Sequence, residues 1–267
     1  MFDFNNIYNV DCYQAIKELP DKCIDLVIID PPYEFESNSG GGCFGTKNRN
    51  YHSEIQDTDV NKDKNINHFE SKGITNEILD ELVRVLKKIN IYIFCNKNQL
   101  RQLLDYFDDL GCNIDLLTWH KTNPIPSCNN RYLSDTEYIV FAREGGVKLY
   151  GSVETKKKWY LTPINVKDKK LYNHPTIKPM EIVSNFVINS SKENDVVFDC
   201  FLGSGTTCVA AKQLNRQYLG FELNPVFFEI AKDRLSNISQ KHKEDLKIYS
   251  QDLFGFNLED KKWISMN

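Results

Sequence analysis

The sequence lacks the features of membrane and secreted proteins. None of its 267 residues lies in a run of the roughly 20 uncharged apolar residues that a membrane-spanning helix needs. The N-terminus has neither the basic start nor the apolar core of a secretory signal. We therefore expect a cytoplasmic protein with no membrane attachment.

Clustered cysteines are also missing. The chain has eight cysteines, but no two of them have CxxC spacing, and no histidine pair follows them at zinc-finger spacing. Several cysteines stand inside apolar runs, where they are typical small buried residues of a reducing compartment. The pattern predicts neither a metal site nor a disulfide framework.

An excess of charge of one sign is absent from the whole chain but present locally. The 33 basic and 37 acidic residues give a net charge of -4, which excludes a protein coated in basic charge. Apolar residues make up 41% and charged residues 26%, as in ordinary globular proteins. Residues 143–178, however, hold nine basic and three acidic side chains. A local basic surface is therefore compatible with the acidic total.

Apolar periodicity predicts strands that alternate with helices. Short apolar runs predict strands over 24–29, 91–95, 113–119, 136–142, 195–200 and 217–222. Helical spacing predicts helices over 74–88, 98–111, 178–191, 204–215 and 224–238, with Pro179 in the first turn of its helix. This order predicts one α/β domain with a mostly parallel sheet covered by helices on both faces. Segments 34–72 and 144–172 have little periodicity, and we expect them at the rim.

Ligands of such sheets bind beyond the carboxyl ends of the strands, and the first polar strand end is Asp30-Pro31-Pro32-Tyr33. The two prolines fix φ at successive positions and remove two backbone donors. The Asp30 carboxylate and the Pro31 carbonyl are then two acceptors beside the flat ring of Tyr33. This combination suits a planar group that bears an NH2.

The second polar strand end is a glycine loop, Asp199-Cys200-Phe201-Leu202-Gly203-Ser204-Gly205-Thr206-Thr207. The glycines allow a sharp turn and a close backbone approach, and the next helix offers free N–H groups to an anion. Glu222 ends the following predicted strand, where an acidic residue can bind ribose hydroxyls. Cys208 replaces the third glycine of a dinucleotide motif, and the lysine of a P-loop is missing. The loop therefore favours a nucleoside cofactor without a pyrophosphate.

Together these motifs resemble the S-adenosylmethionine-dependent amino-methyltransferases of DNA, which methylate adenine N6 or cytosine N4. The DPPY tetrapeptide precedes the glycine loop by about 170 residues, as in the β group of that family. Segments 9–12, 119–124 and 174–179 resemble further family motifs in their expected places. The resemblance implies a Rossmann-like fold with circularly permuted motif order and a single catalytic domain over residues 1–267.

The resemblance also assigns roles to residues. Asp30, Pro31, Pro32 and Tyr33 would be catalytic: Asp30 and the Pro31 carbonyl would accept the two N–H bonds of a base rotated out of the duplex, and Tyr33 would stack on that base. Correct positioning of the amine nitrogen against the methyl group, and the negative charge of Asp30, would both favour methyl transfer. The residues implied for binding S-adenosylmethionine are Asp11, Cys12, Asp30, Thr176, Lys178, Asp199, Phe201, Gly203, Ser204, Gly205, Thr206, Thr207, Glu222 and Asn224. We expect Asp11 also to cap the helix that follows it.

The two rim segments are the expected DNA-binding parts. Segment 34–72 would be a loop insertion that lies against DNA, and segment 143–173 a short basic insert for target recognition. The residues implied for binding double-stranded DNA are Trp119, Lys121, Asn123, Lys47, Arg49, Lys156, Lys157 and Lys158. So short an insert favours a homodimer, and a cognate restriction endonuclease is a further expected partner.

The expected reaction is methylation of adenine N6 at a specific DNA site. Asp30 at the first motif position and the segment Trp119–Pro124 favour adenine. Methylation of cytosine N4 is the first alternative, because its chemistry is the same. More distant alternatives are methylation of RNA or of a protein amide, and a degenerate fold that only binds DNA.

Overall fold

The computed structural model describes residues 2–32, 74–124, 132–164 and 177–238. In this part of the chain, eight strands form one sheet in the order β1-β8-β7-β2-β3-β5-β4-β6. The strands are β1 (Asn6–Asn9), β2 (Leu26–Ile29), β3 (Asn90–Cys95), β4 (Asn113–Lys121), β5 (Thr136–Arg143), β6 (Trp159–Thr162), β7 (Val196–Asp199) and β8 (Gln217–Glu222). The helices are α1 (Cys12–Ala15), the 3-10 helix η1 (Ile16–Glu18), α2 (Asn76–Val85), α3 (Lys97–Asp109), α5 (Met180–Ser190), α6 (Thr206–Gln213) and α7 (Pro225–Ser236).

The sheet is mostly parallel, as predicted, with one exception. Strand β5 lies between β3 and β4 and runs antiparallel to both, whereas the other neighbouring strands are parallel. The start of β5 therefore reaches the edge where β3 ends, since Tyr138 pairs with Cys95. Strands β1 and β6 were not predicted: β1 is short and partly polar, and β6 lies in a segment with little periodicity.

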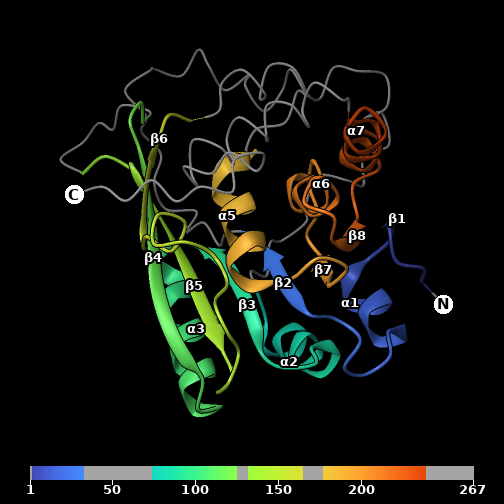
Figure 1. The fold of residues 1–267 in the computed structure, drawn as a ribbon, viewed down its shortest axis with the longest axis horizontal. Coiled ribbons are helices and arrows are strands. Elements are labelled where there is room, and N and C mark those ends of the chain that lie inside the picture. Colours follow the sequence, from blue (N-terminus) through green and yellow to red (C-terminus); the bar gives the residue numbers. More distant parts are fainter. Residues whose placement is uncertain (1, 33–73, 125–131, 165–176, 239–267) are drawn as a thin grey trace, which may run out of the picture.

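Helices cover both faces of the sheet (Figure 1). Alternate side chains of each strand point to opposite faces, and β2 shows this division clearly. Val27 and Ile29 pack with α1, η1, α2 and α3, whereas Leu26 and Ile28 pack with α5, α6 and α7. The buried apolar side chains thus form two core layers that hold the sheet between them.

Helices α2, α5, α6 and α7 each begin one or two residues later than predicted, and for α6 and α5 the backbone gives the reason. Gly205 has φ +84°, a left-handed conformation that excludes it from a helix, so α6 begins at Thr206. Pro179 is extended at ψ 130°, so α5 begins at Met180 and the proline precedes its first turn.

The order of the sheet brings the two polar strand ends together. Strand β2 is hydrogen-bonded to β7, with Val27 in register with Phe198. Because the two strands are parallel, Asp30 and Asp199 leave the sheet at the same edge although the chain between them is long. This neighbour relationship creates the candidate site.

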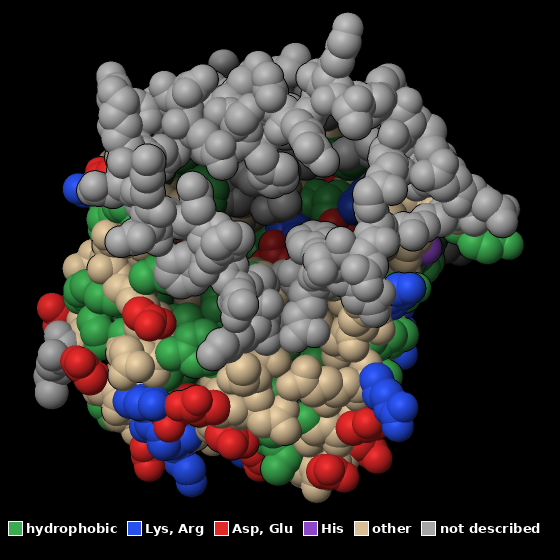
Figure 2. All heavy atoms as spheres, turned by 180° about the vertical axis from the view of Figure 1, so that it is seen from behind, with side chains coloured by type: hydrophobic (Ala, Val, Ile, Leu, Met, Phe, Trp, Pro, Cys, Tyr) green, Lys and Arg blue, Asp and Glu red, His purple; other side chains and the backbone are tan. Residues whose placement is uncertain are grey.

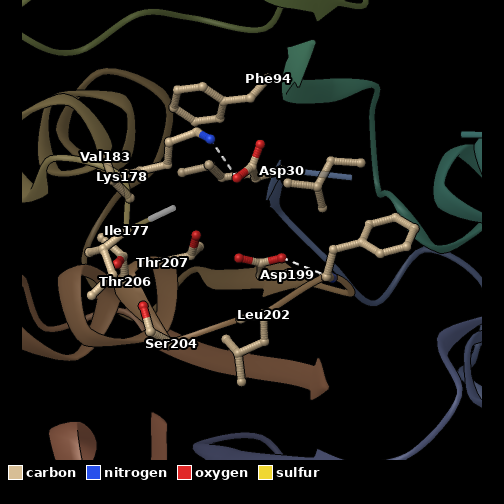
Figure 3. Close-up of a pocket in the computed structure, with 14 residues that line it drawn as sticks. Asp30, Phe94, Ile177, Lys178, Val183, Asp199, Leu202, Ser204, Thr206 and Thr207 are labelled. Carbon is tan, nitrogen blue, oxygen red and sulfur yellow. Dashed lines mark hydrogen bonds and ion pairs between the residues drawn. The ribbon is translucent and has the colours of Figure 1, made fainter. Parts of the chain in front are cut away.

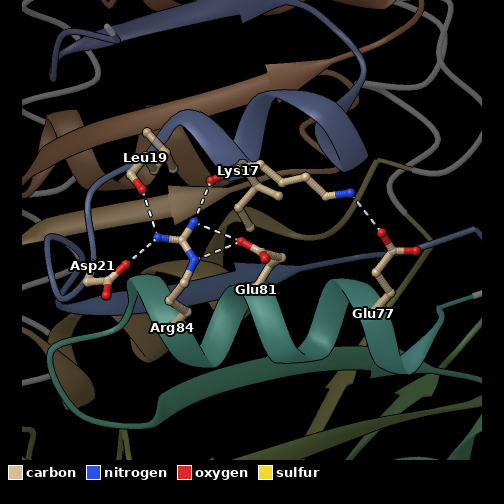
Figure 4. A network of polar contacts seen from close by, with 7 residues as sticks. Lys17, Leu19, Asp21, Glu77, Glu81 and Arg84 are labelled. Atoms are coloured by element: carbon tan, nitrogen blue, oxygen red, sulfur yellow. Dashed lines mark hydrogen bonds and ion pairs between the residues drawn. The ribbon is translucent and has the colours of Figure 1, made fainter.

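An arginine on α2 ties the N-terminal segment to the domain (Figure 4). Arg84 donates hydrogen bonds to the carbonyl oxygens of Ile16 and Leu19 at 2.9 and 2.8 Å. It also pairs with Asp21 at 2.6 Å and with Glu81 at 2.7 Å. The clamp fixes the chain that follows α1.

Basic and acidic side chains alternate over the lower part of the surface in Figure 2, as on an ordinary solvated face. Among the described residues, no helix is long and apolar enough to cross a membrane. In the same part of the chain, no group of histidine, cysteine and acidic side chains could hold a metal ion.

Candidate active site

A pocket of about 40 Å³ lies at the carboxyl ends of β2 and β7 (Figure 3). Eight of the residues predicted to form the site line it, namely Asp30, Lys178, Asp199, Phe201, Gly203, Ser204, Thr206 and Thr207. Figure 3 shows Asp30 and Asp199 facing one another across the pocket. The structure therefore gathers both predicted motifs around one space.

The Asp30 carboxylate is held by a lysine from the segment before α5. Lys178 Nζ donates to Asp30 Oδ2 at 2.5 Å and lies 5.1 Å from the centre of the Phe94 ring. The Lys178 side chain is only 8% exposed. The family resemblance implies a cofactor role for Lys178, and in the structure its ammonium contacts the catalytic tetrapeptide.

A second carboxylate, Glu137 at the start of β5, shares the same ammonium. Its Oε2 lies 3.3 Å from Lys178 Nζ, and its Oε1 lies 2.7 Å from Lys121 Nζ. Burial alone would raise the pKa of Glu137, but the Lys178 and Lys121 ammonium groups outweigh it and lower that pKa. Burial alone would lower the pKa of Lys178, but Asp30 and Glu137 outweigh it and raise that pKa. Glu137 and Lys178 therefore keep their charges, and the four side chains form a row in which acidic and basic groups alternate.

Glu137 is not among the predicted site residues, because site residues are expected at the carboxyl ends of strands. The antiparallel direction of β5 places its beginning, not its end, at the functional edge. A signal did exist: Ile139 and Phe141 face the core, and the period of two places Glu137 on the same buried face. A charged residue at a core-facing position of a strand therefore indicates a site residue at Glu137.

The proline segment is fixed by the start of α3. Gln99 donates from Nε2 to the carbonyl oxygen of Pro32 at 3.1 Å and is itself buried. Gln99 also closes a capping box with Asn96, which accepts from the N–H groups of Asn98 and Gln99. The helix start therefore sets the direction in which the chain leaves β2. Gln99 was not among the predicted site residues.

The glycine loop has the sharp turn that its sequence predicts. Gly203 and Gly205 have φ values of +53° and +84°. A Cβ on Gly205 would lie 2.9 Å from the Ala231 Cβ, so the loop packs directly on α7. Glu222 accepts from the N–H groups of Gly203 at 2.6 Å and Asn224 at 2.8 Å. The acidic end of β8 is thus bound to the loop.

A buried arginine supports the same loop from α7. Arg234 donates to the carbonyl oxygen of Ser204 at 2.6 Å, to the Ser204 hydroxyl at 2.9 Å and to the Thr206 hydroxyl at 3.1 Å. Arg234 is 8% exposed. It was also missed, because a single arginine in a helical pattern looks like a surface residue.

Asp199 lies fully inside the protein at the end of β7. Burial raises its pKa to about 7, although hydrogen bonds from the Thr207 side chain and the Phe201 N–H act in the other direction. Asp30 and Glu222 also raise that pKa, because they are negative charges near the same pocket. Burial likewise raises the pKa of Glu222. Asp30 and Asp199 line this small pocket, and Glu222 is near enough to act on Asp199, so the carboxyl groups favour a ligand that carries positive charge.

The N-terminal motif adjoins this space through β1. Asn9 pairs in register with Glu222, and the chain continues to Asp11 and Cys12 at the same edge. Asp11 accepts from the N–H of Tyr13 at 2.9 Å and so caps α1, as expected. Asn224 caps α7 beside Glu222.

The predicted DNA-binding residues lie farther along the sheet. Trp119 is buried in β4 and donates to the Thr162 hydroxyl at 2.8 Å, and Asn123 accepts from the N–H of Ile164 at 2.6 Å. Lys156, Lys157 and Lys158 precede the edge strand β6, outside the pocket, and Lys157 pairs with Glu154 and Lys158 with Asp115. Tyr33, Lys47, Arg49 and Thr176, and the whole 34–72 segment, lie outside the described residues.

Comparison with known proteins assigns the family. A sequence model of the DNA methylase family, named for N6 and N4 methyltransferases, matches residues 24–233. The chain belongs to the N6/N4 DNA methylase family. This DNA methylase is 31% identical over 259 residues to the Type II methyltransferase M2.MboI of Moraxella bovis, with 91% of each chain covered. It is 30% identical over 246 residues to the Type II methyltransferase M2.LlaDCHI of Lactococcus lactis subsp. cremoris, which covers 86% of this chain and 88% of the relative.

Solved structures confirm the fold class of this methylase. The crystal structure of M1.HpyAVI matches with a TM-score of 0.61 at 24% identity, and it covers 88% of this chain and 99% of that one. PvuII DNA methyltransferase, described as cytosine-N4-specific, matches with a TM-score of 0.64 at 17% identity over 97% of both chains. The predicted family, an S-adenosylmethionine-dependent DNA amino-methyltransferase, is confirmed, and with it the cofactor.

Proposed function

We propose that this enzyme methylates the exocyclic N6 amine of adenine at a specific site in double-stranded DNA. The observation that carries the proposal is the Asp30 carboxylate, which faces the glycine-loop pocket from the end of β2. An aspartate at this position and the segment Trp119–Pro124 support adenine over cytosine.

The residues of the pocket fit S-adenosylmethionine. The cofactor supplies a methyl group that its positive sulfonium makes electrophilic. Asp199, Glu222 and Asp30 supply negative charge around it, and Gly203 lines the pocket, where the absence of a side chain allows a close backbone approach. Ser204, Thr206 and Thr207 offer hydroxyl groups on the same wall. Asp11, Cys12 and Asn224 extend the site at the β1–β8 edge, and Thr176 completes the proposed set.

Asp30 would act on the target amine. Its carboxylate and the Pro31 carbonyl would accept the two N–H bonds, which frees the nitrogen lone pair for attack on the methyl carbon. The nitrogen would bond to the methyl carbon as the C–S bond breaks and leaves its electron pair on sulfur, and the amine proton released afterwards would pass to Asp30 or to water. Asp30 stabilises the positive charge that develops on the nitrogen in between. Tyr33 would stack on the flipped base.

The rim segments would bind the duplex. Segment 34–72 and the basic segment 143–173 would supply the lysines and arginines that phosphate contacts need, with Asn123 beside them. Lys121 was expected to bind DNA as well, but it is largely buried and pairs with Glu137, so it has no part in this proposal. Part of the second segment is built into the sheet as β6, which gives it a fixed position beside β4. A homodimer and a cognate restriction endonuclease belong to the same proposal.

Product analysis tests the function. Purified enzyme is incubated with labelled cofactor and duplex DNA, and the digested nucleosides are separated by mass spectrometry. We expect N6-methyladenine in one short sequence context. N4-methylcytosine would replace the adenine assignment with the cytosine alternative. Label in RNA or peptide alone would overturn the proposal.

A further inference from the structure

The Asp30–Lys178 pair has a third member that no sequence motif marks. Glu137 reaches Lys178 from β5 at 3.3 Å and is not among the residues that line the glycine-loop pocket. Glu137 is 16% exposed and is anchored at its other oxygen by Lys121 at 2.7 Å. Its position is therefore fixed by contacts on both sides.

The charges of these side chains alternate along the row Lys121, Glu137, Lys178 and Asp30. A buried ammonium next to a single carboxylate would neutralise most of that carboxylate's field. With two carboxylates in reach, the ammonium divides its attraction between them. Asp30 then keeps its orientation and also much of its negative charge.

The reaction needs that charge. Methyl transfer places positive charge on the target nitrogen, and Lys178 opposes this charge whereas Asp30 favours it. We propose that Glu137 is a positioning residue for methyl transfer, which holds Lys178 between two carboxylates so that Asp30 remains an effective acceptor. This inference rests on the role of Asp30 in the proposed function.

Glu137→Gln is the direct test, because it keeps the shape of the side chain and removes its charge. We expect kcat to fall about 10-fold while the KM for the cofactor stays close to that of the wild type. Glu137→Asp keeps the charge and should retain most of the activity. Glu144→Gln is the matched control, since Glu144 directly follows β5 but is exposed and lies 3.9 Å from Lys88.

A double-mutant cycle separates positioning from general damage. If Glu137 acts through Lys178, then Glu137→Gln should have no further effect on kcat in a Lys178→Met background. An equal loss in both backgrounds would show that Glu137 acts by another route and would overturn the proposal. Unchanged kcat in a folded Glu137→Gln variant would do the same.

A readout without catalysis distinguishes this inference from the function on which it rests. Lys178 faces Asp30 and Glu137, with the Cys95 thiol and the Asp199 carboxyl close to the same charges. NMR titration of the Lys178 side chain should show a lower pKa in Glu137→Gln than in the wild type. If the wild type labels no DNA while this difference persists, the proposed function fails and the charge row stands. If the pKa of Lys178 is the same in both proteins, Glu137 does not act on the Lys178 ammonium and the proposal is refuted.

Discussion

Asp30 Oδ2 accepts a hydrogen bond from Lys178 Nζ at 2.5 Å, although 148 positions separate the two residues in the sequence. The bond joins the catalytic tetrapeptide to the segment before α5, so it joins the expected site of the target amine to the expected site of the cofactor. The role of Asp30 toward the target amine and the role of Lys178 toward the cofactor can be separated by replacing one side chain at a time.

Asp30→Asn should abolish most of the methyl transfer and weaken cofactor binding much less, because Asp199 and Glu222 still supply negative charge there. The amide keeps the size of the side chain but removes the charge that stabilises the developing ammonium, so kcat should fall by about 10²–10³-fold. Lys178 retains Glu137 as a carboxylate partner in this variant. Single-turnover kinetics measures the loss, and calorimetric titration of the cofactor provides the control. Near-wild-type transfer would remove Asp30 from its role.

Cofactor affinity should increase as the pH rises through about 7. Burial raises the pKa of Asp199 to about 7, so its carboxyl group is largely protonated below that pH in the free protein. A positively charged ligand favours the ionised form, so binding releases a proton from Asp199. Below the pKa, the affinity for the cofactor should therefore rise by up to about tenfold per pH unit. Calorimetry in two buffers of different ionisation enthalpy counts that proton. Asp199→Asn should remove the dependence, and a flat profile in the wild type would contradict the assignment.

The stability of the free protein should change in the opposite direction. The pKa of Asp199 is higher in the folded state than its ordinary value of 3.8, so the folded state binds more protons between these two values. The contribution of this group to the free energy of unfolding therefore falls as the pH rises from about 4 to about 7. Urea unfolding of the wild type and of Asp199→Asn over this range isolates the contribution.

Much of the site followed from the sequence because strand ends and glycine loops are local features. Apolar runs located β2 and β7, and the polar residues after each run are those that line the pocket. Hydrophobic periodicity does not indicate the order of strands in a sheet. The family resemblance implied that β2 and β7 are neighbours. Local pattern and resemblance together therefore placed Asp30 beside Asp199.

The residues that were missed depend on tertiary arrangement. Glu137 belongs to the site only because β5 is antiparallel, and an apolar strand reads the same in either direction. Gln99 and Arg234 act through buried bonds to Pro32 and Ser204, although each stands in an ordinary amphipathic helix pattern. Polar side chains of helices gain such roles from the loops that happen to pack against them.

Gly205→Ala should destabilise the protein and weaken cofactor binding together. The backbone at Gly205 has φ +84°, which is unfavourable for alanine, and the added Cβ would lie 2.9 Å from the Ala231 Cβ. We expect the free energy of unfolding to fall by about 1–3 kcal/mol, as for other overpacked sites. Gly145→Ala is the control, because its Cβ meets nothing within 4 Å. Equal urea midpoints for the two variants would refute the strain at Gly205.

Arg84→Met should loosen the segment that leads from α1 to β2. The methionine keeps part of the apolar stem but leaves the carbonyl oxygens of Ile16 and Leu19 without their charged donor (Figure 4). Because hydrogen bonds to charged groups contribute about 1.5–3 kcal/mol each, the free energy of unfolding should fall by about 2–4 kcal/mol. Lys17→Met removes the exposed pair with Glu77 and should change the free energy of unfolding far less than Arg84→Met. Urea unfolding measures the loss in both variants. Similar losses in the free energy of unfolding would show that the Arg84 contacts with backbone carbonyls stabilise the protein no more than a surface ion pair does.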